Sequence, residues 1–97
     1  MIDIEDRHLL TIKRIFQQLI PGIPVWAFGS RVKQTAKPYS DLDLVIVGAH
    51  RIPQNIYYQI KDAMEESNIP FKVDVLDWHR LSPSFQTIIQ QQYEILS

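Results

Sequence analysis

The stretch AFGSRVKQTAKPYSDLDLVIVG, residues 27–48, combines a glycine-serine turn with the most apolar segment of the chain. Its second half, residues 42–47, is a β-branched and aliphatic run that ends at Gly48 and predicts a buried strand. Side chains alternate across a strand, so Asp41 and Asp43 should share one face and the leucines the other. The segment therefore predicts a pair of carboxylates on a rigid strand.

This pair of carboxylates predicts a cation site. Same-face neighbours on a strand lie about 6.6 to 7 Å apart at the backbone, which lets two carboxylates reach one cation. Two like charges at that distance raise at least one pKa unless a cation, an ion pair or water offsets the repulsion. We therefore expect a divalent cation near Asp41 and Asp43.

A third carboxylate comes from the apolar segment FKVDVLD, residues 71–77. If the strands over 42–47 and 71–76 are neighbours, Asp74 can face the same point as the first two acids. Three hard oxygen donors suit Mg²⁺ or Mn²⁺. Asp77 is the competing ligand, but it points to the opposite side of an ideal strand. A structural role for these acids is the alternative, because nearby basic residues could neutralise them. Those residues are Arg31, Lys37 and Lys72.

The turn before the acidic strand predicts a phosphate site. Gly29 permits close backbone approach, and the amides that follow it can bind a phosphate. Ser30 adds a hydroxyl donor and Arg31 a nearby positive charge. Phosphate donors would then stand beside the cation-binding acids.

Outside this stretch, apolar spacing predicts helices alternating with strands. We expect a helix ending near Ile20, a strand over 25–28, at most two helical turns after Ser30, a helix over 55–67, a strand over 71–77, and a last helix that starts at Ser82 and includes Ile95 and Leu96. This order predicts an α+β fold in α/β layers, with a small mixed β-sheet flanked by helices. We expect residues 1–97 to form a single domain.

Composition narrows the class of protein. The net charge of −1 gives no domain-wide footprint for nucleic acid, so we expect no direct nucleic-acid binding. The chain has no cysteine, which excludes disulfides and thiolate metal sites. An acidic N-terminus does not fit a secretory signal, and the longest apolar run is too short for a membrane span. We expect a soluble, cytoplasmic protein without membrane contact.

Together, G-S-R at 29–31, S-D-L-D-L at 40–44 and V-D-V at 73–75 resemble the minimal nucleotidyltransferases, the MNT group of the DNA polymerase β-like superfamily. The resemblance implies the polymerase β-like fold, two Mg²⁺ ions bound by Asp41, Asp43 and Asp74, and ATP held at Gly29 and Ser30. It implies that Asp74 helps to activate the nucleophile. Arg31 would either steady charge on the phosphates or lie exposed to solvent.

The resemblance also implies a biological role. Such proteins act as antitoxins that transfer AMP from ATP to a tyrosine hydroxyl of a partner HEPN-domain toxin, within a hetero-oligomer. A surface that includes Tyr93 or Trp78 could contact that partner, with core packing as the alternative for each residue. The rival interpretation is a catalytically weak binding module that neutralises the HEPN protein by contact alone. Transfer to a small molecule is a third possibility, disfavoured by the absence of a second lobe.

One residue departs from the family pattern. The chain has Gln34 where related proteins commonly have glycine, and a Cβ restricts positive φ, so we expect the loop after the phosphate turn to follow a different path. Tyr39, just before the acids, could contact a base or an acceptor, or pack within the loop. The three histidines lack metal-ligand spacing and are predicted to have surface roles. They are His8, His50 and His79.

Overall fold

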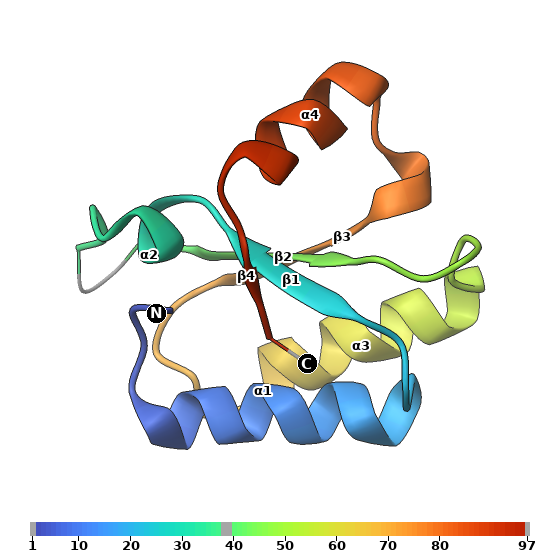
Figure 1. Ribbon diagram of the computed structural model, residues 1–97. Coiled ribbons are helices and arrows are strands. Elements are labelled where there is room, and N and C mark those ends of the chain that lie inside the picture. Colours follow the sequence, from blue (N-terminus) through green and yellow to red (C-terminus); the bar gives the residue numbers. More distant parts are fainter. Residues whose placement is uncertain (1, 38–39, 97) are drawn as a thin grey trace.

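The computed structural model describes residues 2–37 and 40–96. Within these residues the elements follow the predicted order, with η1 and β4 in addition (Figure 1). They are α1 (Asp6–Leu19), β1 (Val25–Phe28), α2 (Ser30–Lys33), β2 (Leu42–Ile46), α3 (Gln54–Glu66), β3 (Val73–Asp77), the 3₁₀ helix η1 (Trp78–Arg80), α4 (Pro83–Gln91) and β4 (Glu94–Ile95).

The strands form one mixed sheet in the order β3-β2-β1-β4. β2 and β3 are parallel neighbours joined by α3, whereas β1 is antiparallel to both β2 and β4. A parallel pair needs a long crossover and an antiparallel pair does not, which is why the helix lies between β2 and β3. The predicted α+β class and mixed sheet are confirmed.

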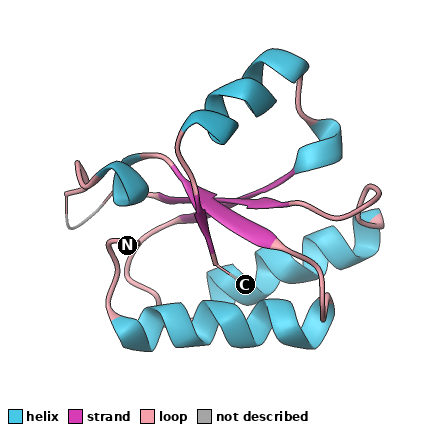
Figure 2. Cartoon of the chain, viewed as in Figure 1, coloured by secondary structure: helices cyan, strands magenta, loops and turns pink. Residues whose placement is uncertain are grey.

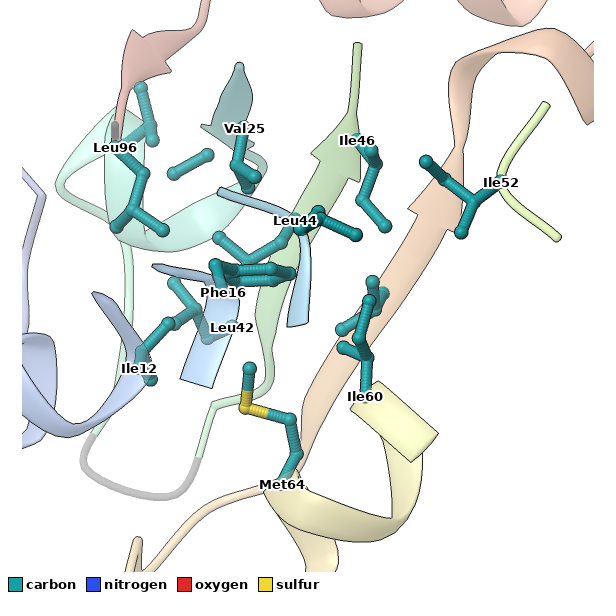
Figure 3. Packing of buried hydrophobic residues seen from close by; sticks show 14 residues of the cluster. Ile12, Phe16, Val25, Leu42, Leu44, Ile46, Ile52, Ile60, Met64 and Leu96 are labelled. Carbon is teal, nitrogen blue, oxygen red and sulfur yellow. The ribbon is translucent and has the colours of Figure 1, made fainter. Parts of the chain in front are cut away.

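The sheet divides the molecule into unequal layers. α1 and α3 lie together across one face, and α4 stands on the other (Figures 1 and 2). Leu42, Leu44 and Ile46 of β2 are fully buried and point toward α1 and α3, where they meet Phe16 and Ile60 (Figure 3). The alternate β2 side chains, including that of Asp43, therefore face the α4 side. The better-packed layer supports the sheet, and the thinner one carries the acids.

The start of α4 follows its sequence signals. The Ser82 hydroxyl accepts a hydrogen bond of 3.3 Å from the Phe85 N–H, and Pro83 occupies the first turn. An N-cap of this kind satisfies a main-chain donor that the helix leaves unpaired. The start of this helix is therefore where the sequence predicts it.

The end of α4 differs from the prediction. The helix stops at Gln91, and β4 pairs with β1, with Trp26 opposite Ile95. The Leu96 N–H donates to the Val25 carbonyl at 2.8 Å, and the Leu96 side chain is buried in the core. The predicted extension of the helix through Leu96 is wrong, because pairing with the open edge of β1 and burial of Leu96 outweigh the helical spacing.

None of the helices in the described ranges is both long enough and apolar enough to cross a membrane.

Candidate active site

The sheet register brings two of the predicted acids together. Asp43 of β2 lies directly opposite Asp74 of β3 in the parallel pair, so both side chains leave the same face. On the other side of β2, Phe28 of β1 is the register partner of Asp43. Asp41 lies two residues before Asp43, at the start of the strand. The predicted adjacency of the two acidic strands is confirmed.

The neighbouring acids affect the ionisation of Asp43. Partial burial raises the pKa of Asp43 above its usual range, and the charges of Asp74 and then Asp41 raise it further. Lys72 opposes this shift, and its Nζ lies 3.4 Å from Asp74 Oδ1 in an exposed ion pair. The face therefore carries negative charge that Lys72 offsets only in part.

The donor chemistry fits a hard divalent cation, although the carboxylates do not yet converge. Across residues 2–37 and 40–96, no three acidic, histidine or cysteine side chains lie close enough to hold a metal ion. Asp41 is exposed, and Asp74 is oriented toward Lys72. Carboxylate oxygens are the ligands that Mg²⁺ prefers, and a cation here would relieve the repulsion that raises the Asp43 pKa.

At Gly29 the main chain of the turn lies close to the carboxylate of Asp43. Its φ of 81° and ψ of −156° lie in a region that is essentially restricted to glycine. A Cβ built at Gly29 would overlap the carboxylate of Asp43. The main chain of the turn can approach Asp43 only because this residue has no side chain. Ser30 follows as the first residue of α2, half-buried beside the same acid-bearing face.

Gln34 adopts a left-handed backbone conformation, although its Cβ disfavours positive φ. Its φ of 61° and ψ of 30° are left-handed, and its N–H donates to the Ser30 carbonyl to end α2. The hydrogen bond and the short helix hold Gln34 at the positive φ that its Cβ disfavours, and the expected different path of the loop stays a prediction. The loop therefore carries backbone strain at this position.

Gln34→Gly is predicted to stabilise the protein. A left-handed conformation costs an ordinary residue about 1–2 kcal/mol, and the greater freedom of glycine in the unfolded chain returns part of this. We expect a net gain of about 0.5–1 kcal/mol, measured as a higher Tm in thermal unfolding. Lys33→Gly, one residue earlier and inside α2, is the matched control and should lower Tm. An equal rise for both variants would contradict strain at Gln34.

Arg31 is buried and makes several contacts. Its side chain is only 6% exposed, so the solvent-exposed alternative is wrong. The guanidinium donates to the carbonyls of Ser40 and Asp3 and lies over the ring of Phe71. Direct phosphate binding by Arg31 stays a prediction. The hydrogen bonds of its guanidinium in this structure go to main-chain carbonyls.

Asp77 has the structural role that was its alternative. It is 3% exposed, and its Oδ2 accepts a hydrogen bond of 2.8 Å from the Ile52 N–H. Its Oδ1 accepts from the His79 N–H at 3.1 Å, and Arg80 Nε lies 3.6 Å from Oδ2. It points to the core side, away from Asp74, as alternation predicts. Through these contacts Asp77 fixes the segment before α3 and the first turn of η1.

The aromatic residues of the α4 side mostly pack together. Tyr93 stacks on Trp26 with ring centroids 4.0 Å apart, and Trp78 meets Trp26 edge-on at 5.5 Å. Tyr93 is nonetheless 38% exposed and neither residue lies in the core, so core packing is wrong for Tyr93, and contact of these residues with a partner stays a prediction. Tyr39 lies outside the described residues.

The histidines differ from one another. His50 and His79 are exposed, as predicted. The ring of His8 is half-buried edge-on against Phe71, with centroids 5.9 Å apart, so a purely surface role for His8 is wrong.

Sequence reasoning missed the main-chain contacts that surround the acids. The Leu42 N–H donates a hydrogen bond of 2.9 Å to the Lys72 carbonyl, a normal length for a bond between strands. The Arg31 side chain donates to the carbonyl of Ser40. Such contacts leave no mark in composition or spacing. The only available signal was the position of Arg31 directly after the turn.

Comparison with known proteins decides the family. Residues 11–97 match the family described as polymerase beta, nucleotidyltransferase. The chain belongs to this family. The resemblance inferred from the G-S and D-x-D motifs is thereby confirmed, and with it the nucleotidyltransferase class of enzyme.

Individual relatives of this nucleotidyltransferase have narrower descriptions. A probable protein adenylyltransferase, MntA, from Haemophilus influenzae (strain ATCC 51907 / DSM 11121 / KW20 / Rd) is 44% identical over 95 residues, which are 98% of this chain and 83% of that protein. A crystal structure of a toxin-antitoxin with AMP-PNP matches with a TM-score of 0.76 and 20% identity, over 92% of this chain and 72% of the other. A toxin-antitoxin MntA-HepT structure matches with a TM-score of 0.63 and 16% identity, over 96% and 72% of the two chains. At these identities the solved structures support the fold.

Proposed function

We propose that this nucleotidyltransferase transfers AMP from ATP to a hydroxyl group, of tyrosine, on a partner HEPN-domain toxin, and so acts as its antitoxin. The observation that carries the proposal is the contact between the turn at Gly29 and the carboxylate of Asp43, with Asp74 directly opposite. A phosphate on the turn would lie next to these acids. The 44% identity to a probable protein adenylyltransferase supports a protein acceptor.

Asp41, Asp43 and Asp74 would hold the Mg²⁺ ions, and Gly29 with Ser30 would hold the triphosphate. Bound Mg²⁺ supplies charge neutralisation on the phosphates and lowers the pKa of the attacking hydroxyl. The protein itself would hold the acids and the glycine-serine turn at a fixed distance from each other, because nucleotidyl transfer depends on positioning and electrostatics. A short β2 supported by the buried core provides that rigidity.

The proposed reaction forms one bond and breaks another. The acceptor oxygen attacks the α-phosphorus of ATP, and the bond from that phosphorus to the bridging oxygen of the β-phosphate breaks. Pyrophosphate leaves with the electron pair, and Asp74 accepts the hydroxyl proton. The products are an AMP-modified acceptor and pyrophosphate.

The layout of the α4 side supports an acceptor on another protein. Asp41 is exposed, so a side chain carried by a partner can reach the acids. Beyond Phe28, which neighbours Asp43, the ring of Phe85 on α4 is 39% exposed and Ile88 is 59% exposed. Exposed apolar surface next to a reactive site suits contact with a protein better than contact with a free sugar or nucleotide.

Incubation with labelled ATP, Mg²⁺ and the HEPN-domain partner tests the proposal. We expect label on the partner, removed when a tyrosine acceptor is changed to phenylalanine, and no label with Asp43→Asn. Label confined to the nucleotidyltransferase itself, or no transfer with any HEPN partner, would overturn it.

The rival candidate is a binding module that neutralises the toxin by contact alone. It predicts that Asp43→Asn still blocks the toxin fully at equal concentration. The retention of all three acids favours the enzyme, because a contact surface has no need of repelling carboxylates. Toxin activity measured with and without ATP separates the two.

A further inference from the structure

Arg31 is a buried charge with an unusual set of partners. A guanidinium stays protonated in proteins, and a charge is retained in a low-dielectric site only when hydrogen bonds compensate it. Arg31 Nε and Nη2 donate to the Ser40 carbonyl at 3.1 and 2.9 Å, and Nη1 donates to the Asp3 carbonyl at 2.7 Å. The guanidinium carbon lies 4.1 Å from the ring centre of Phe71. One side chain thus ties three distant parts of the chain to α2.

The N-terminal contact is reciprocal. The Asp3 N–H donates to the Arg31 carbonyl at 2.8 Å, while the Arg31 side chain donates to the Asp3 carbonyl. The segment before α1 is therefore fixed to the residue that follows the phosphate turn. Both the main chain and the side chain of Arg31 are therefore bonded to Asp3, which precedes α1.

The hydrogen bonds from Arg31 to the Ser40 carbonyl restrain the main chain next to Asp41. The carbonyl of Ser40 and the nitrogen of Asp41 belong to the same planar peptide unit. On the other side of Asp41, the Leu42 N–H donates to the Lys72 carbonyl at 2.9 Å. The carboxylate of Asp41 is exposed, so its location depends on these two flanking peptide groups. Arg31 controls one of them, and the β3 side of the sheet controls the other.

We propose that Arg31 is a positioning residue, which sets the place of Asp41 for metal binding through the Ser40 carbonyl. This inference rests on the proposed function for its catalytic consequence. Groups in a metal site act only within a narrow tolerance of distance, and outer partners that orient ligands typically change metal affinity by about 10–100-fold. The planar fork of arginine is required, because a lysine ammonium cannot reach the Ser40 and Asp3 carbonyls in the same geometry.

Arg31→Lys tests this role, with Arg80→Lys as matched control. Arg80 also donates to a main-chain carbonyl, that of Ile52 at 3.2 Å, and also lies over an aromatic ring, 5.5 Å from the centre of Tyr57. It differs in being exposed, in its ion pair with Asp77, where Arg80 Nε lies 3.6 Å from Oδ2, and in lying away from the loop before Asp41. Both variants keep a positive charge and should lose some thermal stability. The matched pair separates a general packing loss from loss of position at Asp41.

The readouts are Mg²⁺-dependent transfer, Mn²⁺ binding without partner or nucleotide, and hydrogen exchange of the Leu42 amide. For Arg31→Lys we expect a half-saturating Mg²⁺ concentration about tenfold higher, Mn²⁺ binding weakened by a similar factor, and faster exchange at Leu42. Arg80→Lys should change each by less than twofold at a similar loss of Tm. Equal Mn²⁺ affinity in Arg31→Lys and the unmodified protein, or equal effects of the two variants, would overturn the proposal.

The same design separates this inference from the proposed function. If the unmodified protein transfers no AMP to a HEPN partner, the proposed acceptor is wrong, and Mn²⁺ binding with hydrogen exchange still decides the role of Arg31. If transfer occurs and Mn²⁺ affinity does not respond to Arg31→Lys, the function stands and the positioning role fails.

Discussion

Asp43→Asn is expected to abolish AMP transfer and at the same time raise the Tm of the free protein. Losing one ligand of the cations removes several kcal/mol of charge stabilisation in the transition state, which corresponds to a loss on the order of a thousandfold or more in kcat. The amide has the shape of the carboxylate and no charge, so the repulsion from Asp74 and Asp41 disappears. Because the site is partly solvated, we expect a stability gain of at most about 1 kcal/mol.

The pH dependence of this gain has a definite sign. The pKa of Asp43 in the folded protein is raised, so its folded form binds the proton more tightly than the unfolded chain. Its contribution to stability is fully present below the ordinary aspartate value of 3.8 and is lost as pH rises through the folded pKa. The difference in Tm between Asp43→Asn and the unmodified protein should therefore be largest at neutral pH and shrink on acidification.

Two measurements check this interpretation. Asp62→Asn removes the same charge from the exposed side of α3 and should leave both transfer and Tm almost unchanged. Added Mg²⁺ should raise the Tm of the unmodified protein and have little effect on Asp43→Asn. A lower Tm for Asp43→Asn at neutral pH would contradict repulsion among the acids as a destabilising force.

Gly29→Ala is expected to damage both stability and catalysis. The residue lies in backbone space that costs a side-chain-bearing residue about 1–3 kcal/mol, and the new methyl group would also overlap the Asp43 carboxylate. Relief of that overlap moves the acid, and a displacement of about 1 Å at a reacting group can reduce the rate about a hundredfold. We expect a fall in Tm together with at least a hundredfold loss of transfer.

Gly22→Ala provides the matched control for this substitution. Gly22 has a φ of 79°, close to the 81° of Gly29, and no atom lies within 4 Å of a Cβ built there. It should lose stability through backbone strain and keep transfer activity. Combining Gly29→Ala with Asp43→Ala should restore part of the lost Tm, because the second change removes the overlapping oxygens. Strictly additive losses would show that Gly29 and Asp43 do not press on each other.

Several parts of the site were determined by local sequence. Alternation along residues 42–47 placed Asp43 opposite the buried leucines, and the apolar run around Asp74 predicted the neighbouring strand. The register then aligned Asp43 with Asp74. Strand periodicity is a property of the chain itself, so the shared face of Asp41 and Asp43 needed no long-range information, whereas the pairing of β2 with β3 is a tertiary contact. The same residues carry the resemblance to the family, which the match over residues 11–97 confirms.

Other features depended on contacts between distant residues. β4 exists because the open edge of β1 accepts it and Leu96 fills the core, although the local spacing favours a helix. Gln34 takes a left-handed conformation that its residue type disfavours, held by the hydrogen bond to Ser30. Tertiary structure overrode local preference at β4, whereas a hydrogen bond between residues four positions apart holds Gln34.

The sequence by itself determined which residues carry charge, which strand supports them and which turn precedes them, because each depends on residue type and periodicity. Only the tertiary structure decided that the main chain at Gly29 touches the Asp43 carboxylate and that Arg31 is buried against Ser40 and Asp3. All three contacts join residues that are between 9 and 28 positions apart in the sequence. The packing that fixes them is a property of the whole fold, and no local pattern encodes it.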